Sequence, residues 1–220
     1  MRSLDVRLRP PPAVAPEAFA LVADNPALAV ARLHEWNPGA DDSITAFYVC
    51  EGAQAPVVEA LAAAPLVQEV SASGFDDNRF GLLVRLERGG DPFVERLFAA
   101  ITSPGLIVTK PIVYRDGQVR ARLLGTDETL SAVLEQIPGP IDVTVEAIRP
   151  LQDDPRAGFQ GLTAGQRAAL RAAIDLGYYE NPREATHDDV AAALGCASST
   201  ASEHLRKAEA RLARGAVLGF

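Results

Sequence analysis

The sequence predicts an α+β fold in which a mixed front part is followed by an all-α tail. In residues 1–150, segments that alternate between apolar and polar side chains are interspersed with segments of helical spacing, and the pattern recurs at an offset of about 75 residues. Residues 161–220 show only the spacing of helices. The intervening residues 151–160 include Pro155 and Gly158, which oppose a continuous fold and predict a linker.

The first copy of the repeated pattern has the order strand, helix, two strands, helix and strand. Phe19 and Val22 form the apolar side of the first helix, and Asn37-Pro38-Gly39 marks the turn between the two central strands. Val57 and Leu61 are spaced as on one face of the second helix. The copy covers 1–74, with strand 4–9, helix 17–23, strands 28–36 and 43–50, helix 55–64 and strand 66–71.

The second copy has the same order of elements. Asp91-Pro92 opens its first helix, because proline is favoured at the first helical position. Asp116-Gly117 is typical of a two-residue hairpin turn. The copy covers 75–150, with strand 80–87, helix 92–101, strands 106–115 and 118–124, helix 127–137 and strand 141–148.

This βαββαβ order is that of the ferredoxin-like fold, in which two helices cover one face of a four-stranded antiparallel sheet and the other face is covered or polar. We therefore expect tandem ferredoxin-like repeats, each with its own core. In the second repeat, Phe80, Leu82, Val84 and Leu86 should face helices carrying Phe93, Leu97, Leu130 and Leu134. Tandem copies resemble ACT-type regulatory modules, which implies either a small-molecule effector or simple association, and the sequence leaves both open.

The tail begins with a capped helix. Thr163 and Gln166 have the spacing of a capping box, and the helix that follows carries Leu170, Ala173 and Ile174 on one side before it ends near Gly177. The connection after it contains Pro182, which prevents one continuous helix.

The rest of the tail reads as a short helix, a glycine turn and a longer helix. Thr186 and Asp189 form a second capping box, Gly195 suits a left-handed turn, and Ser198 is a plausible N-cap. The small Ala191 lets the two helices cross closely. This is the layout of a helix-turn-helix, whose second helix enters the DNA major groove. Buried positions are expected at Val190 and Leu194 in the first helix and at Ala201, Leu205, Ala208 and Leu212 in the second.

Three motifs in this tail occur in register: Leu-Thr-x-x-Gln-Arg at 162–167, Gly-Tyr-Tyr-Glu-x-Pro-Arg at 177–183, and Leu-Gly-Cys-x-Ser-Ser-Thr-x-x-Glu-His-Leu-Arg-Lys-Ala at 194–208. Together they resemble the helix-turn-helix domain of the bacterio-opsin activator family of halophilic archaea, over about the last quarter of the chain. The resemblance implies a transcription regulator. It places on or beside the recognition helix Ser198, Ser199, Thr200, Ser202, Glu203, Arg206 and Lys207.

The net charge of −8 is unusual for a DNA-binding protein, because phosphate contacts use Lys and Arg. The tail from 157 to 220 holds seven basic and seven acidic residues, so the rest of the chain carries the entire net charge. We expect Arg206, Lys207, Arg211 and Arg214 to contact phosphates, and Ser199, Ser202 and Glu203 to contact base edges. An acidic surface with two lysines among 21 basic residues fits the high-salt cytoplasm that the resemblance implies.

The partner that follows is double-stranded DNA, read by a homodimer that presents two recognition helices to two half-sites. The neutral tail leaves a second hypothesis open, in which the helix-turn-helix of an adaptor contacts another transcription factor. The sequence holds no catalytic constellation, so we expect no enzyme and no cofactor. It has no apolar run of the roughly eighteen residues that span a bilayer and no signal-peptide core, so we expect a soluble, cytoplasmic chain.

Other candidate sites have simpler interpretations. Gly89-Gly90-Asp91 could bind an anion but is typical of a turn with a cap, and His34, Glu35 and Trp36 could line a pocket but are typical of packing residues. Cys50 and Cys196 lack the spacing of a disulfide framework, and no metal site is expected with His187 and His204. The paired carboxylates are expected in solvated turns, at 41–42, 76–77 and 153–154.

Overall fold

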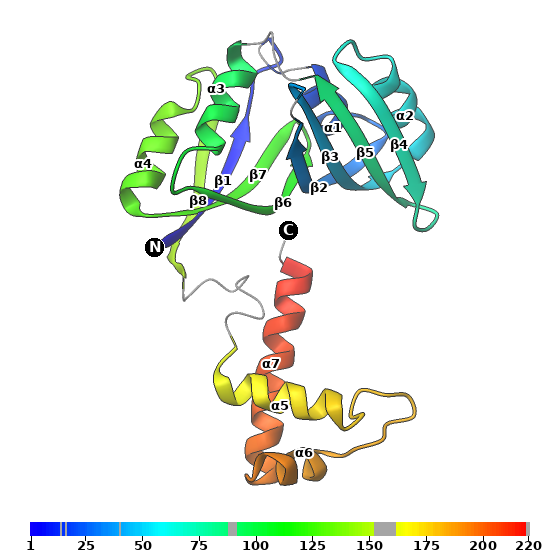
Figure 1. The fold of residues 1–220 in the computed structure, drawn as a ribbon, viewed down its shortest axis with the longest axis vertical. Coiled ribbons are helices and arrows are strands. Elements are labelled where there is room, and N and C mark those ends of the chain that lie inside the picture. Colours follow the sequence, from blue (N-terminus) through cyan, green and yellow to red (C-terminus); the bar gives the residue numbers. More distant parts are fainter. Residues whose placement is uncertain (14, 16, 40, 88–91, 152–161, 219–220) are drawn as a thin grey trace. The chain divides into compact units, whose positions relative to one another are not determined.

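The computed structural model describes residues 1–13, 15, 17–39, 41–87, 92–151 and 162–218 (Figure 1). The chain divides into two units, Met1–Pro150 and Leu151–Phe220. Every strand and helix of the first unit lies within three residues of the bounds expected from the sequence. These elements are β1 (Arg2–Arg9), α1 (Glu17–Ala23), β2 (Leu28–Pro38), β3 (Ser43–Gly52), α2 (Gln54–Ala62), β4 (Val67–Gly74), β5 (Arg79–Glu87), α3 (Pro92–Ile101), β6 (Ile107–Arg115), β7 (Gln118–Gly125), α4 (Asp127–Gln136) and β8 (Asp142–Pro150).

The described strands form one antiparallel sheet in the order β4-β5-β3-β2-β6-β7-β1-β8. Residues directly opposite each other on neighbouring strands share a face of the sheet. The register therefore carries one apolar face continuously across the junction between β2 and β6. A row of paired residues on that face runs Phe80, Cys50, Ala31, Tyr114, Val119, Leu8.

The strand order exchanges the first strands of the two copies. In a ferredoxin-like sheet built from the first copy alone, β1 would lie between β3 and β4. In this structure β5 occupies that place, and β1 lies between β7 and β8 in the other half of the sheet. The boundary expected between residues 74 and 75 falls at the turn of the β4–β5 hairpin, inside the first unit.

The core packing follows this exchange. Phe80, Leu82 and Val84 of β5 pack with Val57 and Leu61 of α2, so the expectation that they face the helices of the second copy is wrong. The second cluster contains Leu4 and Val6 of β1 with Leu123, Leu130 and Val133. Figure 1 accordingly shows α1 and α2 beside β3, β4 and β5, and α3 and α4 beside β1, β7 and β8.

The opposite face of the sheet is rich in charged residues, as alternation along the strands requires. Asp5 lies on this face, is 7% exposed, and accepts hydrogen bonds from Arg122 Nε at 2.7 Å and Arg149 Nη1 at 2.8 Å. Arg7 Nε donates to Glu146 at 3.1 Å at a more exposed position. These ion pairs satisfy charges that the sheet would otherwise bury without a partner.

The second unit contains α5 (Ala164–Asp175), α6 (His187–Leu194) and α7 (Ser198–Leu218). Both expected capping boxes are present, at Thr163 with Gln166 and at Thr186 with Asp189. Ile174 is 60% exposed, so its expected place in the core is wrong; Ala169 is buried on the side of α5 that faces the other helices. The buried set is Ala169, Ala173, Tyr178, Ala185, Val190, Ala191, Ala201 and Leu205, with a smaller cluster of Leu162, Leu170 and Ala208.

A double-mutant cycle tests the strand exchange. Leu4→Ala and Leu130→Ala remove side chains from one cluster, so we expect an interaction of about 0.5–3 kcal/mol between them in unfolding free energy measured with guanidinium chloride. Leu4→Ala combined with Leu61→Ala, whose side chain lies in the other cluster, should be additive within about 0.5 kcal/mol. Coupling in the second pair and additivity in the first would contradict the exchange.

Gly195 tests the turn between α6 and α7. It has φ 66° and ψ 33°, and no atom lies within 4 Å of a Cβ built there, so a substitution meets backbone strain without a steric clash. We expect Gly195→Ala to lower the unfolding free energy by about 1–2 kcal/mol and Gly195→Asn to lower it less, because asparagine enters the left-handed region more readily. Equal losses in thermal unfolding would point to a cause other than backbone conformation.

Candidate nucleic-acid interface

The first three turns of α7 separate a buried stripe from an exposed polar surface. Ala201, Leu205 and Ala208 are at most 1% exposed, because their spacing of four and three residues turns one side of the helix toward α5 and α6. The remaining positions, apart from His204, form what we call the polar face of α7. In it Ser202 is half-buried, and the exposed members are Ser198, Ser199, Thr200, Glu203, Arg206 and Lys207.

The turn that precedes this face is short and fixed by backbone hydrogen bonds. The N–H of Cys196 donates to the carbonyl of Ala191 at 3.1 Å, which closes the end of α6 around Gly195. The Ala197 carbonyl accepts from Thr200 and Ala201, so Ala197 occupies the capping position of α7. The expectation that Ser198 is the N-cap is therefore wrong by one residue, and its side chain lies on the first turn of the polar face.

The helix α5 supports α7 by close approach. A Cβ at Gly165 would lie 3.1 Å from Nε2 of His204, so glycine leaves room for this ring against the start of α5. His204 is half-buried and packs against the start of α5. The contact fixes the second turn of α7 against the supporting helix.

Aromatic residues in the connection between α5 and α6 also anchor α7. The Tyr178 hydroxyl lies 2.9 Å from His187 Nε2, and the Arg183 guanidinium lies 4.2 Å from the Tyr178 ring centre. The Tyr179 hydroxyl donates to Glu209 of α7 at 2.6 Å. Burial, followed by this carboxylate, raises the pKa of Tyr179. Sequence reasoning missed this anchoring role, although the aromatic pair followed by Pro-Arg was a visible signal.

Charge on the polar face is partly neutralised within α7. Lys207 Nζ lies 2.6 Å from Glu203 Oε1, one helical turn away. The hydrogen bond from Lys207 holds the pKa of Glu203 below its usual value, so Glu203 carries its negative charge at neutral pH. Arg206 is exposed and forms no ion pair with any residue that the structure describes. It is therefore the least neutralised cation on the polar face.

The two arginines further along α7 that were expected to contact phosphates differ in their exposure to solvent. Arg214 is exposed, whereas Arg211 is half-buried, and its Nε atom is buried without a hydrogen-bond partner in the described part of the chain. Because a guanidinium that is partly withdrawn from solvent reaches a phosphate less easily, Arg214 is better placed than Arg211 for such a contact.

The candidates in the first unit have structural roles or lie outside the described residues. Lys110 pairs with Glu35 and lies 5.4 Å from the Trp36 ring centre, and Trp36 packs against the core. Asp41 pairs with Arg85, and Asp76 with Arg79 at 2.6 Å. The segments Gly89-Gly90-Asp91 and Asp153-Asp154 lie outside the residues that the structure describes.

The cysteines are apart and differ in environment. Cys50 is buried in the core, where desolvation raises the pKa of its thiol to about 12, and Cys196 is half-buried in the second unit. The described ranges contain no group of three or more His, Cys, Asp and Glu residues that could hold a metal ion. No described helix is both long and apolar enough to cross a membrane.

Comparison with known proteins identifies both units. Residues 162–214 match the family described as an HTH DNA binding domain. Residues 17–150, more than half of the chain, match the N-terminal family HVO_0513_N.

Three similar regulators come from halophilic archaea. The chain is 51% identical over 51 residues to the transcriptional regulator NarO of Haloferax volcanii, which covers 23% of this chain and 24% of NarO. It is 46% identical over 55 residues to the dimethyl sulfoxide reductase transcriptional activator of Halobacterium salinarum, 25% of each chain. It is 45% identical over 57 residues to a putative transcriptional regulator of Haloferax volcanii, 26% of this chain and 10% of that protein.

The matched segments thus span about a quarter or less of each of these relatives. The resemblance of the second unit to the bacterio-opsin activator family is confirmed. The chain belongs to the HVO_0513_N family, and its C-terminal unit is a helix-turn-helix DNA-binding domain of the bacterio-opsin activator type.

Proposed function

We propose that this protein is a transcription regulator that binds double-stranded DNA by placing the start of α7 in the major groove. The observation that carries the proposal is the polar face of α7, exposed directly after a three-residue turn, on a helix whose other side is buried. A recognition helix in this layout contacts base edges with its N-terminal residues. The regulators named in the comparisons are consistent with this role.

The residues of the interface divide by chemistry. Ser199, Ser202 and Glu203 lie in the first two turns and can contact base edges, with Glu203 able to accept from cytosine. Ser198 and Thr200 lie in the first turn of α7 and can contact the sugar-phosphate backbone of the DNA, because the N–H groups at a helix start favour phosphate. The cations assigned to phosphates are Arg206, Lys207, Arg211 and Arg214, of which Arg206 and Arg214 are the most available.

The first unit presents the DNA-binding unit, in this proposal, as a homodimer. It combines two ferredoxin-like copies, 1–74 and 75–150, whose first strands are exchanged. The tandem arrangement of the copies resembles ACT-like modules. The segment 151–160 links it to residues 161–220. Because the second unit has balanced charge, a single copy gains little from phosphates, and two copies on two half-sites provide the affinity. The protein acts in the cytoplasm with the chromosome, and effector binding to the first unit changes its DNA binding.

A second candidate is an adaptor whose helix-turn-helix contacts another transcription factor. It is favoured by the ion pair between Glu203 and Lys207, which reduces the positive field of the polar face. Pull-down of genomic fragments followed by sequencing separates the two. Enrichment of a common motif supports DNA recognition, and unselective or absent binding supports the adaptor.

Arg206→Ala and Ser202→Ala should have different effects on the enriched duplex. Loss of the Arg206 charge is expected to weaken binding to all sequences and lower the slope of log K against log salt by about one. Ser202→Ala should change which bases are preferred and leave the slope unchanged. Fluorescence anisotropy at several salt concentrations measures both. Arg171 is an exposed arginine on α5, so Arg171→Ala serves as the control. If Arg171→Ala weakened binding as much as Arg206→Ala, the assignment of Arg206 to a phosphate contact would be wrong.

Glu203→Gln should strengthen DNA binding, in contrast to Arg206→Ala. It removes the carboxylate beside Lys207, so Lys207 becomes available to a phosphate, and we expect tighter binding to unrelated duplexes with a steeper salt slope. The same measurement with the Glu203→Gln, Lys207→Gln double variant should cancel the gain. Tighter binding that persists in the double variant would show that Lys207 is not the cause.

A further inference from the structure

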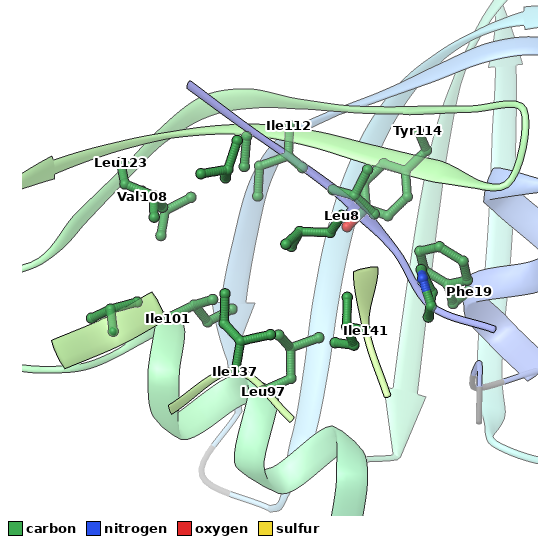
Figure 2. A pocket seen from close by; sticks show the side chains of 15 residues that line it. Leu8, Phe19, Leu97, Ile101, Val108, Ile112, Tyr114, Leu123, Ile137 and Ile141 are labelled. Carbon is green, nitrogen blue, oxygen red and sulfur yellow. The ribbon is translucent and has the colours of Figure 1, made fainter. Parts of the chain in front are cut away.

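The half of the sheet that contains β1 borders a partly open cavity of about 160 Å³ beneath α3 and α4. Figure 2 shows Leu97, Ile101 and Ile137 on one side of it and Leu8, Ile112 and Tyr114 on the other, with Phe19 at one end. The strand exchange builds one wall, because Leu8 belongs to β1. Phe19 comes from α1, whose Val22 packs with Val57 and Leu61 of α2 in the other cluster.

The walls of this cavity are almost entirely hydrocarbon. Among the fifteen described residues that line it, the Tyr114 hydroxyl is the only side-chain oxygen. A buried water needs two to four polar partners, which these side chains do not supply. A charged ligand would lose its hydration without compensation. The lining therefore selects uncharged molecules with at most one polar group.

The equivalent space in the other half of the sheet is filled. There Phe80 and Leu82 of β5 and Tyr48 of β3 pack directly with Val57 and Leu61 of α2. Around the cavity, Leu97 and Ile101 of α3 line an empty space instead. Protein interiors hold few voids larger than a water molecule, so a space of this size beneath α3 and α4 is unusual.

A second pocket adjoins the cavity. It is larger, about 490 Å³, and shares Pro10 and Phe19 with the cavity. Its other walls include three carboxylates, of Asp24, Asp116 and Asp142, so it is more polar than the cavity. The Phe19 ring lies between the two spaces, edge-on to Tyr114, with 6.0 Å between ring centres.

We propose that the first unit binds a small, uncharged, largely apolar molecule of about the size of benzene in this cavity. The size follows from the volume, since an apolar protein cavity of about 150 Å³ accommodates benzene. The ligand's role as the effector of DNA binding rests on the proposed function, whereas its binding does not. Tyr114 offers the hydroxyl for a ligand with one polar group.

The test uses full-length protein with benzene, toluene and indole as probes. Trp36 is the only tryptophan in the chain, so its fluorescence follows unfolding of the first unit alone. Occupation of the native state raises its stability, and a probe at about five times its Kd should raise Tm by about 2–4 °C, saturably. Benzylammonium and benzoate, of similar shape but charged, should produce no rise.

Two variants and a control place the binding in the cavity. Ala121→Leu fills it and should abolish the rise, whereas Ala99→Leu makes the same change on the exposed side of α3 and should retain it. Ile101→Ala enlarges the cavity and should add a Tm rise with naphthalene that the wild type lacks. This second variant decides the matter if Ala121→Leu does not fold.

The proposal is overturned if none of the probes gives a saturable rise in the wild type, if folded Ala121→Leu keeps the rise, or if Ile101→Ala gains nothing with naphthalene. DNA binding is measured separately by anisotropy, with and without toluene. Absence of DNA binding would contradict the proposed function and leave the thermal result intact, and absence of a thermal rise would leave DNA recognition intact.

Discussion

The architecture of the first unit depends on the pairing of β1 with β7 and β8. This pairing joins residues 2–9 to the far end of the unit, so the two copies cannot form separate sheets. It also sets the register. Because side chains alternate with a period of two, a slip of one residue in β1 would turn Leu4 and Val6 to the charged face and Asp5 into the core. The correct register satisfies both faces together: Leu4 and Val6 complete one cluster, and Asp5 meets Arg122 and Arg149.

The second unit achieves its geometry with small residues and capped ends. Alanines at 169, 191 and 201 and the glycine at 165 let the three helices approach closely, so little apolar area is needed to hold them. Capping boxes satisfy the helix starts, and Tyr179 ties the connecting loop to α7. The surface left over is polar with balanced charge.

The sequence predicted local features well because local chemistry determines them. The capping boxes at Thr163 and Thr186, the Asp116-Gly117 turn and the left-handed Gly195 each depend on a few adjacent residues. The exchange of β1 and β5 was not predictable in this way, since both strands alternate similarly and the choice of neighbour is made by packing across the unit. Ile174 followed the helical period and still lies in solvent, because no partner element passes over that side of α5 among the described residues. The apolar cavity is the sum of many side-chain volumes contributed by distant segments, and no motif marks it.

The register also makes the two ends of the first unit neighbours, since Arg2 is paired with Pro150. A segment whose ends meet can be moved into another protein, or reopened elsewhere, without stretching its backbone. If the chain were rearranged so that β1 followed β8 through a tight turn, every strand would keep its neighbours, and the exchange would become an ordinary hairpin. The order of the strands along the chain and their order in the sheet are thus separable in this fold.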